Sequence, residues 1–235
     1  MQPFRSGNEY VSRLCPGVQL LLKEDRIELR SQEPLYALSS AVWPGGFSET
    51  DTIVNWKVPL TYQCDDPVQD IREQCVQWGY DAERTVGFIT AAKLTHAAVQ
   101  ESEGDGFKLL CCTTSGTKNA ARAGMPRKTF PSYMPGTINT MIMIDGELSQ
   151  SAMVNAVITA TEAKTAALQK LGIVERANGE SATGTTTDAI AIAITRNKNW
   201  GVKHVYAGSA TSLGCTLAEA VYRSVYVACK TQDED

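Results

Sequence analysis

The sequence predicts a mixed α/β protein in which a mixed β-sheet is flanked by helices. Two observations carry this prediction. The first quarter of the chain is a series of short apolar strands separated by turns, and residues 137–195 read as strand, helix and strand, the lengths of a βαβ unit. A length of 235 residues is that of one large domain, so we expect a single domain over residues 1–235 that ends in a short acidic tail, 231–235.

The N-terminal quarter is expected to be rich in strands. Residues 18–31 predict two strands around a charged turn, and residues 34–42 and 51–58 predict two more. The proline and glycines of WPGGFSE separate the last two strands, because these residues interrupt regular strand pairing.

The next segment contains the first predicted helix. Residues 66–78 have apolar side chains at helical spacing, with Asp66 as N-cap, Pro67 in the first turn and Gly79 as the stop. Residues 86–100 are compatible either with a strand that enters a helix or with one helix.

The middle of the chain alternates strands and loops. Residues 107–115 predict a strand whose C-terminal end is polar, and residues 117–124 predict a loop with a short helix. A proline-punctuated link then leads to a strand at 137–145 that begins polar and becomes apolar.

The C-terminal half is expected to hold two long helices around a central strand. Ser149 is the predicted N-cap of a helix over 149–171, and Gly172 ends it. The predicted apolar face of this helix comprises Val154, Val157, Ile158, Leu168 and Leu171. The strand at 188–195 is apolar on both faces, which is typical of a central strand, and residues 212–230 predict the last helix.

Polar strand ends are expected to meet at one edge of the sheet. The βαβ lengths predict that strands 137–145 and 188–195 are parallel, so their polar N-terminal ends lie together. If strand 107–115 is antiparallel beside them, its polar C-terminal end reaches the same edge. The residues gathered there would be Thr114, Ser115, Asn119, Thr137, Asn139, Thr185, Thr187 and Asp188. They either line a pocket or merely satisfy backbone groups at strand ends, and both interpretations remain open.

Two charged residues flank the predicted apolar seam of the 149–171 helix. Glu162 and Lys164 lie on opposite sides of that seam, so each is free to reach a different neighbour. Glu162 is either a general base or a solvated flank residue. Asp188 has a similar alternative, because it could cap its own loop at the strand entrance.

Composition excludes several classes of function. The net charge is −4 with Lys and Arg scattered, which argues against nucleic-acid binding. No apolar run approaches the roughly 18 residues that span a bilayer, so we expect a cytoplasmic protein without membrane association. Seven cysteines without a CxxC pair and only two histidines predict no metal site. The spacings of a P-loop, a GxSxG elbow and an HExxH motif are missing from the sequence.

Eight segments in order resemble the adenosylcobinamide amidohydrolase family, CbiZ, over about residues 35–226. They are LSSA, VNWKVP, VGFITAA, TSGTKNAARAG, GTINTMIMID, TATEAKTAAL, ATGTTTDAIAIA and YAGSATSLGCTLAEAVY. TATEAK followed by ATGTTTDA is the specific pairing among them. The resemblance implies an enzyme that hydrolyses the amide between aminopropanol and the corrin ring of adenosylcobinamide, giving adenosylcobyric acid for cobamide salvage.

This resemblance also implies the ligands. The partner is a small-molecule corrinoid, and a pocket rimmed by Thr, Ser and Asn offers donors and acceptors to its amide side chains. No cofactor is predicted, since cobalt enters only as part of the substrate. The oligomeric state is left open.

Amide hydrolysis needs a nucleophile, a proton for the leaving amine and donors to the oxyanion. We hypothesise that Glu162 or Asp188 activates a water or Thr185, and that Lys164 or Lys118 assists the leaving group. Backbone N–H groups around Gly184 would stabilise the oxyanion. The residues expected to bind substrate are Ser115, Asn119, Thr137, Asn139, Gly184, Thr187 and Gly208.

One position departs from the family pattern. The pattern carries a histidine two residues after YAG, where this chain has Ala210. This departure motivates the alternative of a non-catalytic corrinoid-binding protein. A weaker alternative is a phosphate-binding or kinase-like domain that uses the Gly and Thr loops.

Overall fold

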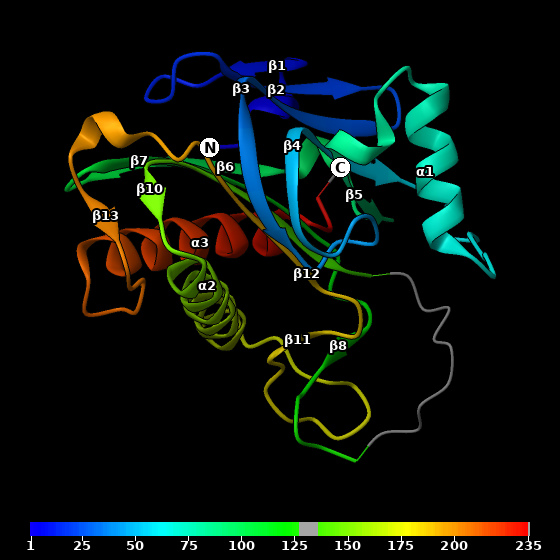
Figure 1. Cartoon of the computed structure of the whole chain (residues 1–235). Helices are drawn as coiled ribbons and strands as arrows, with labels where there is room; N and C mark the ends of the chain where they lie inside the picture. The colour runs from blue at the N-terminus through cyan, green and yellow to red at the C-terminus, as the bar shows by residue number, and fades with distance from the viewer. Residues whose placement is uncertain (127–135, 235) are drawn as a thin grey trace.

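The computed structural model describes residues 1–126 and 136–234, and it confirms the mixed α/β class. Within these residues a curled mixed sheet of nine strands packs against three α-helices (Figure 1). The proline-punctuated link predicted before residue 136 lies for the most part outside the described residues.

The strands of the large sheet follow one spatial path that branches at β3. From one edge, the path runs β1 (Glu9–Val11), β2 (Val18–Lys23), β3 (Arg26–Ser39), β12 (Ala189–Ile194), β9 (Ile138–Asp145), β7 (Phe107–Ser115) and β6 (Ala98–Gly104). On the other side of β3 lie β4 (Gly46–Lys57) and then β5 (Thr85–Thr90). Two small sheets pair β10 (Glu147–Leu148) with β13 (Lys203–His204) and β8 (Ala120–Ala121) with β11 (Gly184–Thr185).

The predicted βαβ unit is confirmed. β12 pairs in parallel with β9, and α2 (Gln150–Lys170) is the crossover between them. The N-cap of α2 is Ser149, whose hydroxyl accepts a hydrogen bond from the backbone N–H of Ala152 at 3.0 Å. β12 lies between β3 and β9, so its alternating Ile and Ala residues are covered on both faces, as expected for a central strand.

The sheet separates two main cores. On one face, α2 and α3 (Ser212–Thr231) lie against the sheet (Figure 1). Their buried side chains form one core with those of β7, β9 and β12. The other face curls around a second core to which the N-terminal strands contribute. The side-chain alternation of each strand therefore sends successive residues into different environments.

The helix predicted at residues 66–78 is also confirmed, as α1 (Pro67–Gln77). Asp66 caps it by accepting a hydrogen bond from the Gln69 N–H at 3.0 Å, and Ile71 and Cys75 are its buried residues. This helix covers a small third cluster on β4 and β5 that contains Val54.

Two local predictions need correction. Residues 86–100 contain no α-helix but form β5, a short 3-10 turn at Leu94–His96 and the start of β6. The β-branched and aromatic VGFIT segment pairs with β4, which outweighs the helical spacing that follows. Residues 117–124 do not form a helix either. Instead, β8 pairs there with β11, which belongs to the segment TGTTTD at residues 183–188, the TGTTTD loop.

The predicted apolar face of α2 is wrong for two of its members. Val154 is 47% exposed and Ile158 is 50% exposed. The buried face consists mainly of small residues, namely Ala152, Met153, Ala156, Thr159, Ala160, Ala163, Ala167 and Leu168. Small side chains allow α2 to approach α3 and the sheet closely. The alanine-rich face is therefore buried, and the face with Val154 and Ile158 is exposed.

Gly214 marks a second close approach. A Cβ at this position in the first turn of α3 would overlap the carbonyl oxygens of Ala207 and Gly208. Gly7 offers a matched comparison, because a Cβ there has Pro3 O at 3.7 Å as its nearest neighbour.

We predict that Gly214→Ala lowers the free energy of unfolding by about 1–3 kcal/mol, because the helix must move away from the backbone it contacts. Gly7→Ala serves as the control and should stay close to the wild type. Urea denaturation of the three proteins measures the difference, and equal stability of the two variants would contradict the predicted contact.

Candidate active site

Three strand ends meet at one edge of the large sheet, as the sequence predicted. In the ladders, Asn139 of β9 is paired with Ala189 of β12 on one side and with Thr114 of β7 on the other. β7 is antiparallel to β9, so its polar C-terminal end joins the N-terminal ends of the two parallel strands. The TGTTTD loop leads directly into this edge.

Asp188 is the centre of the hydrogen bonding at this edge. Its Oδ1 accepts bonds from the Ile138 N–H at 3.1 Å and the Thr185 hydroxyl at 2.5 Å. Its Oδ2 accepts bonds from the Thr185 N–H at 3.0 Å and from the ammonium group of Lys164. The carboxylate therefore joins β9, the loop and α2 in one cluster.

Lys164 reaches this carboxylate from the helix. The side chains of Lys164 and Asp188 are only 15% and 14% exposed, so their ion pair is largely removed from water. Thr165 ties the same turn of α2 to the loop by donating a hydrogen bond to Thr183 O at 2.9 Å. Gly184 is needed beside the pair, because a Cβ there would overlap Asp188 Oδ2 and lie 2.8 Å from Lys164 Nζ.

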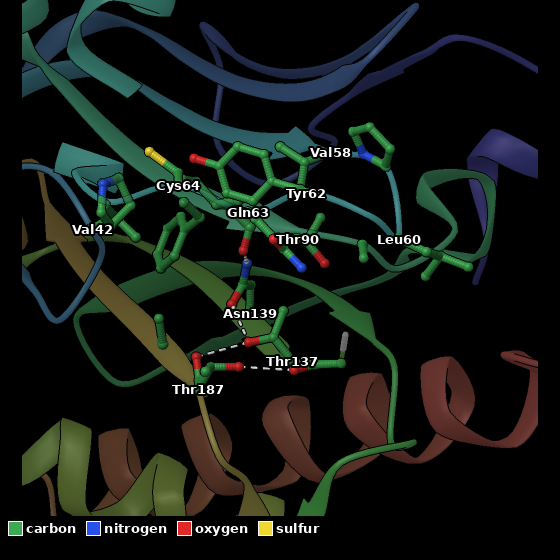
Figure 2. Close-up of a pocket in the computed structure, with 17 residues that line it drawn as sticks. Val42, Val58, Leu60, Tyr62, Gln63, Cys64, Thr90, Thr137, Asn139 and Thr187 are labelled. Atoms are coloured by element: carbon green, nitrogen blue, oxygen red, sulfur yellow. Dashed lines mark hydrogen bonds between the residues drawn. The ribbon is translucent and has the colours of Figure 1, made fainter. Parts of the chain in front are cut away.

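A second polar network lies on the opposite face of the sheet. Asn139 donates from Nδ2 to Asn55 Oδ1 at 2.9 Å and to Ile89 O at 3.0 Å. Asn55 donates in turn to Thr114 Oγ1 at 2.7 Å. The Thr137 hydroxyl is 3.1 Å from Asn139 Oδ1 and 2.8 Å from Thr187 O (Figure 2). All the polar groups of the Asn139 side chain are therefore engaged.

Other predicted site residues support the same edge through hydrogen bonds. Asn119 donates from Nδ2 to Gly136 O at 2.6 Å and to Thr186 Oγ1 at 2.7 Å. Thr187 also donates to Gly136 O, at 2.8 Å. Ser115 lies 2.9 Å from the thiol sulfur of Cys229. These contacts fix the loop against β9 and the end of β7.

The structure does not bring every predicted residue to this edge. Glu162 is exposed and makes no hydrogen bond or ion pair with the Asp188 cluster among the described residues. Lys118 is exposed as well and does not bond to the cluster, although it lines a separate cavity with Ser115 and Gly136. Gly208 lies before α3, beside Asn155 of α2. Asn155 precedes Lys164 by nine positions, roughly 14 Å along a helix, so Gly208 is remote from the cluster.

Two of the cavities at the sheet edge share Ala189 of β12 in their lining. One, of about 260 Å³, lies between α2 and the sheet and is lined by Lys164 and Asp188 together with apolar and hydroxyl side chains. The other, of about 330 Å³, is lined by Thr137, Asn139 and Thr187 (Figure 2).

Some residues of this edge were not predicted. Asn55 is completely buried, and Tyr62 and Gln63 line the larger cavity. A polar residue within the apolar strand segment DTIVNWKV was the available signal for Asn55. Tyr62 and Gln63 precede a helix and have no periodic signature, so only folding could place them.

The described residues contain no group of three or more His, Cys, Asp or Glu side chains that could hold a metal ion. The cysteines are free, and five of them are buried. Burial raises the pKa of Cys229 to about 11 despite its hydrogen bond with Ser115, which keeps the thiol protonated at neutral pH. Among residues 1–126 and 136–234, no helix is long and apolar enough to cross a membrane.

The chain belongs to the adenosylcobinamide amidohydrolase family, CbiZ, whose profile matches residues 13–235. Among its relatives, an adenosylcobinamide amidohydrolase of Methanosarcina mazei is 29% identical over 196 residues, covering 81% of this chain and 88% of that one. An uncharacterized protein of Methanocaldococcus jannaschii is 32% identical over 211 residues, 80% of each chain. Among solved structures, a Burkholderia beta-aminopeptidase aligns with a TM-score of 0.48 and 11% identity, covering 87% of this chain and 78% of that one.

We predict that the Lys164–Asp188 pair is energetically coupled. Lys164→Met or Asp188→Asn alone leaves one member of a largely buried pair without its partner charge, and each should lower the free energy of unfolding by about 3 kcal/mol. The double variant should lose less than the sum of the two single losses. Denaturant titrations of the four proteins measure this cycle, and strict additivity would mean that the two groups do not interact.

Proposed function

We propose that this chain hydrolyses the amide bond between aminopropanol and the corrin side chain of adenosylcobinamide, giving adenosylcobyric acid for cobamide salvage. Membership of the CbiZ family and the relative from Methanosarcina mazei support the reaction class. The observation that carries the proposal is the hydrogen bonding of Thr185 and Lys164 to Asp188, which lines the cavity under α2 together with Lys164.

Thr185 is the proposed nucleophile. Within the described part of the chain it is the one side-chain hydroxyl that donates to Asp188. Asp188 already accepts four donors, so a water could reach it only by displacing one of them. Activation of the bound hydroxyl by the carboxylate is therefore the simpler route.

The chemical steps follow from these positions. Thr185 Oγ1 attacks the amide carbonyl carbon, and its proton passes to Asp188. The C–N bond then breaks, and the ammonium group of Lys164 protonates the departing amine of aminopropanol. A water then hydrolyses the resulting ester: its hydroxyl group bonds to the carbonyl carbon to give the acid, and its proton restores the Thr185 hydroxyl. The proton held by Asp188 passes to Lys164, which returns the pair to its starting charges. No cofactor takes part in this scheme, and cobalt belongs to the substrate.

The remaining polar residues have a different role in the proposal. Hydrogen bonds fix the backbone at the sheet edge, and they involve Thr137, Asn139, Thr187 and Asn119. In the proposal, this edge faces the amide side chains at the rim of a corrinoid. The cavity between α2 and the sheet has a mixed apolar and polar lining that includes Lys164 and Asp188, and it would accept the side chain that carries the scissile amide.

Ala210 lies apart from this chemistry. It is exposed in the segment before α3, next to Thr211, the N-cap of that helix. The contacts of Thr185, Asp188 and Lys164 do not involve it. The departure from the family pattern at this position therefore leaves the proposed catalytic cluster intact.

The first test is to incubate the purified protein with adenosylcobinamide and to follow the corrinoid by mass spectrometry while aminopropanol is assayed. Conversion to adenosylcobyric acid with an equal amount of aminopropanol is expected. Binding of the corrinoid without conversion would instead support a non-catalytic corrinoid-binding protein.

Variants then separate the candidate residues. Thr185→Val should lower kcat by at least about 100-fold, whereas Thr185→Ser keeps a hydroxyl and should retain measurable turnover. Glu162→Gln is the control for a carboxylate outside the cluster and should turn over at the wild-type rate. If Glu162→Gln loses activity while Thr185→Val remains active, Thr185 is not the nucleophile and Glu162 is the general base.

A further inference from the structure

The larger cavity has the composition of a site for a planar, largely apolar ligand. Its apolar lining comprises Val42, Val58, Pro59, Leu60, Phe88 and Ile89, and its floor carries Thr137, Asn139 and Thr187. A volume of about 330 Å³ lies at the lower end of the range of about 300–1,000 Å³ for small-molecule pockets. That size suits a nucleoside rather than the much larger corrin macrocycle.

Gln63 supplies an unused amide at this cavity. Figure 2 shows Tyr62, Gln63 and Cys64 on one side of the pocket, opposite Asn139, Thr137 and Thr187. Gln63 is an exposed residue whose side-chain amide makes no hydrogen bond to any described residue, so it is open to a ligand, whereas the amide of Asn139 is buried and fully engaged. A ligand that enters the pocket therefore meets one free donor and one free acceptor in a single plane.

Adenine matches this arrangement. A glutamine amide forms a bidentate pair with adenine, donating to a ring nitrogen and accepting from the 6-amino group. Aromatic side chains can also stack on the base. Stacking does not distinguish one base from another, so the contact with the edge of the base determines the preference for adenine.

Tyr62 is held in place for such a contact. Its hydroxyl donates to Asp70 Oδ2 at 2.7 Å, which anchors the ring to α1. Burial and the neighbouring Asp70 carboxylate raise the pKa of Tyr62, so the phenol stays neutral. The ring also packs edge-on against Trp56, with centroids 6.0 Å apart.

The cavity is close to the proposed catalytic cluster. Thr187 lines it, and the next residue, Asp188, lines the cavity on the other face of the sheet. Ala189 borders both cavities. A ligand that lies across the sheet edge can therefore place one group in each.

We propose that this pocket binds the adenosyl group of the corrinoid substrate, with Gln63 contacting the edge of the adenine and Tyr62 packing against the base. This inference rests on the proposed function, because it assigns one part of that substrate to a site. It makes Gln63 a specificity-determining residue that distinguishes adenosylated from non-adenosylated corrinoids.

A binding experiment tests the pocket without requiring catalysis. Titration of the full chain with 5′-deoxyadenosine, followed by isothermal calorimetry or ligand-observed NMR, should show binding by the wild type. Gln63→Ala should weaken it about tenfold. Gln77→Ala is the control, because Gln77 is an exposed glutamine at the end of α1 outside the pocket lining. Binding of 5′-deoxyinosine, which lacks the 6-amino group, should be weaker than that of 5′-deoxyadenosine in the wild type only.

A kinetic experiment tests the same assignment on the reaction. The ratio of kcat/KM for adenosylcobinamide to that for hydroxocobinamide should fall about tenfold in Gln63→Ala and stay constant in Gln77→Ala. An unchanged ratio in Gln63→Ala, or no binding of 5′-deoxyadenosine to the wild type at millimolar concentration, would overturn the assignment.

The two proposals fail in different ways. Binding of 5′-deoxyadenosine that depends on Gln63, without turnover of any corrinoid, would support the adenine site and reject the hydrolase. Turnover of adenosylcobinamide with the same ratio of the two kcat/KM values in the wild type and in Gln63→Ala would support the hydrolase and reject this pocket as the adenosyl site.

Discussion

The largely buried carboxylate of Asp188 is the constraint on which the rest of this site depends. Four donors from β9, the TGTTTD loop and α2 converge on its two oxygens. A charge removed from water must be paired and hydrogen-bonded, so these elements cannot move apart independently. The crossover helix of the βαβ unit is thereby fixed to the strand entrance, and the same bonds orient the Thr185 hydroxyl.

The pleat of the sheet divides the edge into two functional surfaces. On β9, Ile138 and Thr140 face the cavity under α2, whereas Asn139 faces the larger pocket. The two residues just before β12 continue this division, with Asp188 at the cavity under α2 and Thr187 at the larger pocket. Side-chain alternation with a period of two residues thus places successive residues of one short segment in two different cavities.

Small side chains allow the two long helices to pack closely. The alanine-rich face of α2 lies against α3 and the sheet, and the glycine at position 214 brings the first turn of α3 against the preceding backbone. Both contacts depend on small side chains. The bulkier Val154 and Ile158 remain outside, although helical periodicity alone favoured them for the core.

The sequence by itself determined the βαβ unit, the central strand, the caps at Ser149 and Asp66, and the meeting of polar strand ends, because these follow from local periodicity and from the connection rules of parallel strands. It also named Asp188, Lys164 and Thr185. Only the tertiary structure decided that Asp188, Lys164 and Thr185 contact one another, that Glu162 and Gly208 lie elsewhere, and that Gln63 lines a pocket. Such contacts join residues far apart in the chain, and their free energy depends on burial and packing, which no local pattern encodes.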